Sequence, residues 1–205
     1  MREVSFPHVQ LSLNFKDVED AKELVRAVKK GPKVVLEAST PLIKSEGIIC
    51  VSLLREEWPD AFIIANMGFL SDIDLECEIV AEGGADGMIA SHFKSIEDLK
   101  AFIRGCEKRK LLSYLDTDSP NIITMIKEVK PHAIIFRRET LNAEIVGKAK
   151  ELGIRVGVRE IMELEEVRAW VGRGVDIFVI GKDMVGSLDA LLETVRRFER
   201  SYRKL

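Results

Sequence analysis

The sequence has few of the residues that mark several common classes of protein. It contains three cysteines, Cys50, Cys77 and Cys106, whose odd number and wide spacing fit neither a disulfide framework nor a zinc-binding motif. No apolar run is long enough to cross a bilayer, and the first residues contain no apolar signal core. These absences predict a soluble protein of the reducing cytoplasm with no membrane partner.

An excess of basic charge is also missing. A formal net charge of −3 and a pI of about 5.8 leave no surplus of lysine and arginine to neutralise a phosphate backbone. We therefore expect no nucleic-acid partner, although a local cluster of donors can still bind a small anion. Glutamine occurs once and charged residues make up 32% of the chain, a composition that leans towards that of thermophiles.

The apolar residues that are present follow a regular order. With 46% hydrophobic residues, a chain of 205 residues can bury one sizeable core. Short apolar runs recur about every 25 residues, which is the spacing of strand–helix units. Eight such runs are predicted as strands, at residues 9–13, 34–36, 62–65, 87–90, 111–115, 133–136, 154–158 and 177–180.

Helical patterns separate these runs. Ser119 followed by Pro120 predicts a helix start, and Ser95 with Asp98 three residues on is a weaker capping signal. Alternating strands and helices favour a parallel sheet, and eight units in one chain favour its closure. The sequence therefore predicts a single-domain (β/α)8 barrel over residues 1–205, with any chemistry at the carboxyl ends of the strands.

Residues 37–47, Glu-Ala-Ser-Thr-Pro-Leu-Ile-Lys-Ser-Glu-Gly, carry a more specific signal. A short apolar run ends at Glu37, and the chain then passes through Ser-Thr-Pro into a helical pattern. This stretch resembles the 3-hexulose-6-phosphate synthases and their relatives in the orotidine 5'-monophosphate decarboxylase superfamily. Over nearly the whole chain, the spacing of the strand–helix units is also similar to that of the family. The resemblance implies a (β/α)8 barrel, carbon–carbon lyase chemistry and a homodimer.

The resemblance also implies a set of ionisable residues that this sequence lacks. In the family the third strand ends in Asp-x-Lys-x-x-Asp and the first strand adds an Asp; in the synthase branch the carboxylates hold Mg²⁺ on an enediolate. When the third strands are aligned, the Asp, Lys and Asp of the family motif correspond to Asn66, Gly68 and Ser71 here. When the first strands are aligned, the family's Asp corresponds to Asn14. An amide is a weak Mg²⁺ ligand, and glycine supplies neither charge nor proton. We therefore expect no cofactor, with Mg²⁺ involved only if the site has been rebuilt.

Three residues remain as catalytic candidates, each with a structural alternative. Glu37 is either a pocket carboxylate or a strand end paired with a base such as Lys44 or Lys33. Asp72 substitutes for a lost carboxylate if the loop is shifted, but helix starts also favour Asp. His92 is the most plausible titratable group at the rim, or else a structural hydrogen-bonding residue.

The phosphate-binding end of the family site is better preserved. The resemblance implies glycines after the seventh and eighth strands and an arginine after the eighth, where Gly157, Gly181 and Lys182 stand here. Tight turns and a surface lysine are the alternative explanation. Arg137 is a further anion ligand or part of an ion-pair patch. The expected ligand is a small phosphorylated metabolite, bound by Asn14, Asn66, Arg137, Gly157, Gly181 and Lys182.

Several other residues complete the prediction. Asp116 and Asp118 are either metal ligands or a charged loop before a helix, and His8 and His132 are assigned to the stability face. Candidate dimer contacts are Trp58, Phe69, Leu70 and Phe93. Two functions remain open: a catalytically degenerate relative that binds a phosphorylated metabolite, or an active lyase or isomerase with a rebuilt site.

Overall fold

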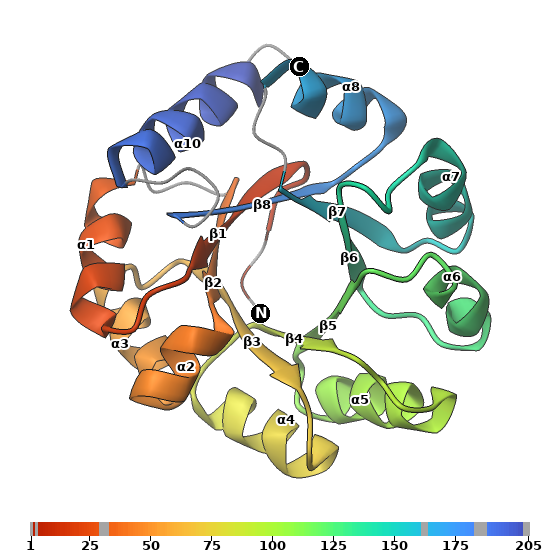
Figure 1. Ribbon diagram of the computed structural model, residues 1–205. Helices are drawn as coiled ribbons and strands as arrows, with labels where there is room; N and C mark the ends of the chain where they lie inside the picture. The colour runs from red at the N-terminus through yellow and green to blue at the C-terminus, as the bar shows by residue number, and fades with distance from the viewer. Residues whose placement is uncertain (1, 3, 29–32, 161–163, 183–187, 203–205) are drawn as a thin grey trace.

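Eight parallel strands close into a barrel in which each strand pairs with the next and β8 pairs with β1 (Figure 1). The computed structural model describes residues 2, 4–28, 33–160, 164–182 and 188–202. The predicted (β/α)8 barrel is confirmed, and every predicted strand is present at its expected place, although β3 runs on to Phe69. The strands are β1 (His8–Leu13), β2 (Val34–Ala38), β3 (Phe62–Phe69), β4 (Gly87–Ser91), β5 (Leu112–Thr117), β6 (Ala133–Arg137), β7 (Arg155–Arg159) and β8 (Ile177–Gly181).

Helices surround the barrel and cover its outer face (Figure 1). Their inward sides, the outer faces of the strands and the ends of several loops form one large apolar core. The helices are α1 (Val18–Ala27), α2 (Thr40–Glu46), α3 (Ile49–Glu57), α4 (Ile73–Glu82), α5 (Ile96–Lys108), α6 (Ile122–Met125) with a 3-10 turn η1 (Ile126–Glu128), α7 (Ala143–Glu151), α8 (Leu164–Arg173) and α10 (Leu188–Tyr202).

Helix starts test two of the sequence predictions. Ser95 caps α5 as expected, because its hydroxyl accepts a hydrogen bond from the backbone N–H of Asp98 at 3.0 Å. The predicted start at Ser119-Pro120 is wrong, since α6 begins at Ile122. The chain first makes a local turn in which the Ser119 N–H donates to Thr117 Oγ1 at 3.0 Å, which delays the helix.

Strand alternation divides the side chains between the outer core and the barrel axis. In β1, Leu11 packs towards the helices, whereas Gln10 and Ser12 point towards Glu37 of β2. The lower half of the interior is filled by a second apolar cluster, consisting of Val35, Phe62, Ile64, Ile89, Tyr114, Ala133, Ile135, Ile177 and Val179. The same alternation brings polar residues into the layer above it, at the carboxyl ends of the strands.

Candidate functional site

Glu37 lies at the centre of the polar layer and is only 1% exposed. It accepts hydrogen bonds from Gln10 Nε2 at 2.5 Å, Ser12 Oγ at 3.2 Å and Asn66 Nδ2 at 2.8 Å. Burying a carboxylate is costly unless donors replace its water. These three donors are neutral side chains and not the lysines considered as alternatives, so Glu37 is a buried site carboxylate facing the barrel axis.

Arg159, the last residue of β7, supplies the positive charge of this layer. Its Nη2 lies 3.8 Å from Glu37 Oε1 and 2.8 Å from Asp116 Oδ2, and its Nε donates to Asp116 Oδ1 at 3.1 Å. The bidentate contact with Asp116 uses the planar fork of the guanidinium. The three residues form a carboxylate–guanidinium–carboxylate triad across β2, β5 and β7.

Asp116 experiences opposing electrostatic influences. Burial raises the pKa of Asp116 above its ordinary value and the nearby Glu37 carboxylate adds to that rise, whereas the charge and hydrogen bonds of Arg159 oppose it. The net direction is upward, so Asp116 holds a proton more readily than a solvated carboxyl group. A carboxyl group in that condition is suited to proton transfer.

The end of β3, where the resemblance places a lysine, contains an irregular segment. A register shift between Asn66 and Gly68 marks a bulge, and Gly68 has φ +68°. Thr40 Oγ1 donates to the Asn66 carbonyl at 2.8 Å, and the Gly68 N–H donates to Asn66 Oδ1 at 3.1 Å. The backbone here is held by Asn66 and Thr40, and a left-handed position disfavours any side chain at 68.

Substitution of Gly68 tests this local structure. We expect Gly68→Ala to lower the free energy of unfolding by about 1–2 kcal/mol, because φ is positive and the new Cβ would lie 3.3 Å from Thr40 Oγ1. Gly147→Ala is the matched control, since Gly147 lies inside α7 with open space around its Cα; it should gain up to about 1 kcal/mol. Equal stability of the two variants in urea titrations would contradict this account.

Asp72 and Ser71 take part in starting α4. Asp72 Oδ1 accepts from the Leu75 N–H at 3.2 Å, and Ser71 donates from both its N–H and its hydroxyl to Glu76 Oε1. Both residues are exposed. The helix-cap alternative accounts for Asp72, and the geometry does not bring it to the triad.

Of the residues proposed to bind phosphate, Gly157 lies inside β7 and not at its end. A Cβ there would lie 2.9 Å from Ile135 Cγ1 and 3.1 Å from Ile177 Cβ, so packing accounts for this glycine. Gly181 ends β8, and the next residue, Lys182, is exposed with its Nζ 5.4 Å from the centroid of the Phe15 ring. The rest of that loop, residues 183–187, lies outside the described residues.

The other proposed ligands lie around the rim. Asn66 joins the Glu37 network, and Asn14 follows β1 and is partly exposed. Arg137 ends β6, is exposed and lies 3.8 Å from Glu160, as the ion-pair alternative predicted. This pair is long and solvated, so it contributes little to stability.

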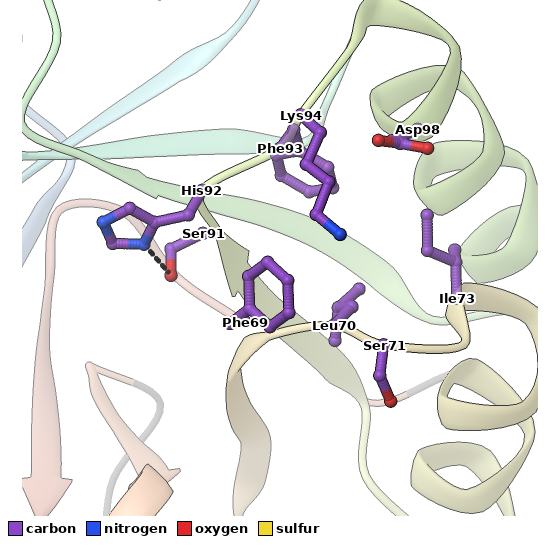
Figure 2. A pocket seen from close by; sticks show the side chains of 9 residues that line it. All are labelled: Phe69, Leu70, Ser71, Ile73, Ser91, His92, Phe93, Lys94 and Asp98. Atoms are coloured by element: carbon purple, nitrogen blue, oxygen red, sulfur yellow. Dashed lines mark hydrogen bonds between the residues drawn. The ribbon is translucent and has the colours of Figure 1, made fainter.

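Two cavities open beside His92, which has φ +58° and whose Nδ1 lies 2.9 Å from Ser91 Oγ. Figure 2 shows the smaller one, about 100 Å³, between the loops that precede α4 and α5. The larger one, about 270 Å³, has Asp116 in its wall and is lined by His92, Phe93, Leu115, Asp116, Thr117, Asp118, Ser119, Ile122 and Met125. Its wall combines apolar side chains with acidic and hydroxyl groups, as small-molecule sites do.

A divalent cation does not fit the residues of this layer. Glu37 and Asp116 supply its carboxylates, and the Arg159 guanidinium lies between them. Asn66 offers an amide where the resemblance calls for a carboxylate. Within the described ranges, no three His, Cys, Asp or Glu side chains gather in a group suited to a metal ion.

Two of the four candidate dimer contacts have little exposed surface to offer a partner. Trp58 is 6% exposed and Leu70 is 9% exposed, and both pack into the outer core. Phe69 is 53% exposed, with Lys94 Nζ 5.1 Å from its ring centroid, and Phe93 packs partly against the core.

None of the helices in the described part of the chain has the length and apolar content that a bilayer crossing requires.

Fold and site together define a (β/α)8 barrel with a polar site at the carboxyl ends of its strands. Solved structures with the same fold include KGPDC from Streptococcus mutans (TM-score 0.80, 20% identity, 98% of this chain and 99% of that one). A 3-hexulose-6-phosphate synthase has a TM-score of 0.79 at 16% identity, covering 95% and 99%. Orotidine 5'-monophosphate decarboxylase from Methanocaldococcus jannaschii has a TM-score of 0.75 at 18% identity, covering 95% and 98%.

Sequence comparison confirms the resemblance to this superfamily. The chain is 29% identical over 210 residues to the bifunctional enzyme Fae/Hps of Methanosarcina barkeri, covering 97% of this chain and 53% of that enzyme. It is 28% identical over 213 residues to Fae/Hps of Methanocella arvoryzae, covering 97% and 54%. The chain thus spans about half the length of these curated relatives. No protein-family model matches it.

Proposed function

We propose that this barrel binds a small phosphorylated metabolite at the carboxyl ends of its strands and does not run metal-assisted lyase chemistry. The observation that carries the proposal is the position of Arg159 between Glu37 and Asp116. A guanidinium in that position pairs closely with Asp116 and lies within ion-pair distance of Glu37, so it already occupies the space between the two carboxylates. A divalent cation would meet its repulsion and would have to displace it, at a cost in buried ion pairing.

Catalysis of the family type also needs a positioned proton donor. The resemblance places a lysine at position 68, but here a glycine occupies a bulge whose backbone is held by Asn66 and Thr40. One fixed charge of this kind is worth about 10²–10³ in rate, so the loss of several leaves no useful turnover. The triad orders the site and takes no part in bond cleavage.

The phosphate part of the proposal rests on the end of β8. Gly181 and the exposed Lys182 lie where a backbone turn and a point charge can meet a phosphate. One structural relative, KGPDC from Streptococcus mutans, was also solved in complex with a ligand. A phosphate ester bound to this chain would extend from Lys182 towards the triad.

A thermal-shift screen tests this proposal. Sugar phosphates, nucleotides and inorganic phosphate are added with and without Mg²⁺ to wild type, Lys182→Ala and Lys148→Ala, an exposed lysine on α7. At about 100 times Kd, a bound ligand stabilises by about 2.7 kcal/mol, or about 5–10 °C here. We expect a phosphate ester to raise the melting temperature of wild type and Lys148→Ala in the absence of Mg²⁺. The melting temperature of Lys182→Ala should not rise.

Turnover assays provide the contradicting outcome. Condensation of ribulose 5-phosphate with formaldehyde, or decarboxylation of orotidine 5'-monophosphate, is expected to stay at the uncatalysed rate with Mg²⁺ present. Measurable turnover in either assay, lost in Glu37→Gln, would refute the proposal. A screen in which no phosphorylated compound raises the melting temperature would refute its binding part.

One observation favours the alternative, an active lyase or isomerase with a rebuilt site. Asp116 has a raised pKa and borders the 270 Å³ cavity, with His92 at the rim. A carboxyl group and an imidazole facing one cavity can share acid–base work. This function predicts turnover of a sugar phosphate that Asp116→Asn abolishes and that needs no added metal. Homodimer formation stays a prediction for either function, to be measured by light scattering.

A further inference from the structure

Two buried cysteines face each other across the contact between α4 and α5. Cys77 lies in the middle of α4 and Cys106 in the last turn of α5, and both are 0% exposed. The interaction between the two thiols lowers the pKa of Cys77 and raises that of Cys106. The two cysteines are far apart in the sequence, and the packing of α4 against α5 brings them together.

The backbone of α5 is adapted to this contact. A Cβ on Gly105 would lie 2.9 Å from Cys77 Sγ, so a glycine at 105 lets α5 approach α4 at the position next to Cys106. Arg109, just after α5, also joins the two helices. Its guanidinium donates hydrogen bonds to Asp74 at 2.7 Å and to Glu78 at 2.9 Å, both on α4. Its positive charge also lowers the pKa of Cys77.

These contacts resemble the arrangement of a nucleophilic thiol and its resolving partner. The neighbouring Cys106 thiol and the Arg109 guanidinium both lower the pKa of Cys77 and so stabilise its thiolate. Cys50, on α3, serves as the internal comparison: it is equally buried, and burial raises its pKa to about 11. Position in the fold therefore separates the pair from the third cysteine.

We infer that Cys77 and Cys106 form a dithiol that small disulfides oxidise to an intramolecular disulfide between α4 and α5. The Cys77 thiolate attacks one sulfur of a disulfide such as oxidised glutathione, which gives a mixed disulfide and one released thiolate. Cys106 then loses its proton and attacks the Cys77 sulfur, which expels the second thiolate. Two electrons pass from the protein to the glutathione disulfide, and the two cysteine protons end on two glutathione molecules.

Burial sets the rate of this reaction. The reagent reaches Cys77 only when the α4–α5 contact opens locally, so oxidation should take minutes to hours. The bridge would join helices that follow β3 and β4, the two strands whose loops line the pocket of Figure 2. It uses no residue of the triad.

The test is mass spectrometry of the folded chain after incubation with oxidised glutathione. Free thiols are alkylated under denaturing conditions and the protein is digested. Before alkylation, the intact wild-type chain should become lighter by two hydrogen atoms. Its digest should contain one linked peptide pair carrying Cys77 and Cys106, and a reductant should separate the two peptides. Cys50 should stay alkylated.

Variants make the assignment specific. Cys50→Ala should form the same linked pair at an unchanged rate, whereas Cys77→Ala should form none and Cys106→Ala should stop at a glutathione adduct. The wild-type measurement does not depend on how well the variants fold. Two free thiols at 77 and 106 after a day in the oxidant, or linkage of either one to Cys50, would overturn the inference.

Discussion

Replacing Arg159 with alanine is expected to lower the free energy of unfolding by about 3–5 kcal/mol at pH 7. The change leaves the carboxylates of Glu37, 1% exposed, and Asp116, 26% exposed, without the cation that lies between them. Urea titration measures the loss. Arg159→Lys should lose less, because it keeps the charge but not the bidentate fork.

The dependence of this loss on pH identifies its electrostatic cause. Asp116 already has a pKa raised above its ordinary value, so its ionised form costs stability above the folded pKa and costs nothing below the unfolded one. Removing Arg159 raises that pKa further. The difference between wild type and Arg159→Ala should therefore shrink as the pH falls from 7 towards the ordinary carboxyl range.

Arg137→Ala is the control for this experiment. Arg137 is also the last residue of its strand, but its side chain is 54% exposed and lies 3.8 Å from Glu160. Its loss should change the free energy of unfolding by less than about 1 kcal/mol. If Arg159→Ala behaved like Arg137→Ala, the triad would not be the ordered centre of the site.

Acid is expected to destabilise the protein through His8, at the opposite end of the barrel. His8 is 0% exposed, its ring centroid lies 5.0 Å from that of Phe6, and burial lowers its pKa from 6.5 to about 3. Between pH 6.5 and about pH 3, His8 is therefore protonated in the unfolded chain and neutral in the folded chain. Stability contributed by neutral His8 is complete above pH 6.5 and falls as the pH drops towards 3, by up to about 4–5 kcal/mol.

His8→Leu isolates this contribution. The variant should lose less stability between pH 6.5 and pH 3 than wild type, and the remaining loss includes His132, whose pKa burial also lowers. His92→Leu, at the exposed rim, should keep the full wild-type acid sensitivity. Parallel stability curves for wild type and His8→Leu across this range would show that another group controls the acid transition.

The architecture was predictable because it depends on short-range patterns. Apolar runs of strand length recur at a regular spacing, and a closed barrel gives eight such strands two buried faces each and leaves no edge strand. Helix ends were harder: Ser95 was identified correctly, whereas Ser119-Pro120 was placed too early. A local turn satisfied by Thr117 competes with the cap and is not distinguished from it by residue type.

The candidate site was predicted only in part. Glu37 was expected at a strand end, and the structure places it at the centre of the layer. Arg159 lies directly after the predicted seventh strand, but it was given no role in the site. The available signal was strand parity: Arg159 is two residues beyond Gly157 and so faces the barrel axis with it.

The sequence alone predicted the barrel and the resemblance carried by residues 37–47. It also has Asn14, Asn66, Gly68 and Ser71 where that resemblance implies ionisable residues. Only the tertiary structure decided which charges meet. Asp116 of β5 and Arg159 of β7 are 43 residues apart in the chain, and Glu37 of β2 is further still from both. Ion pairing depends on distance in space and on burial, and both are set by barrel closure.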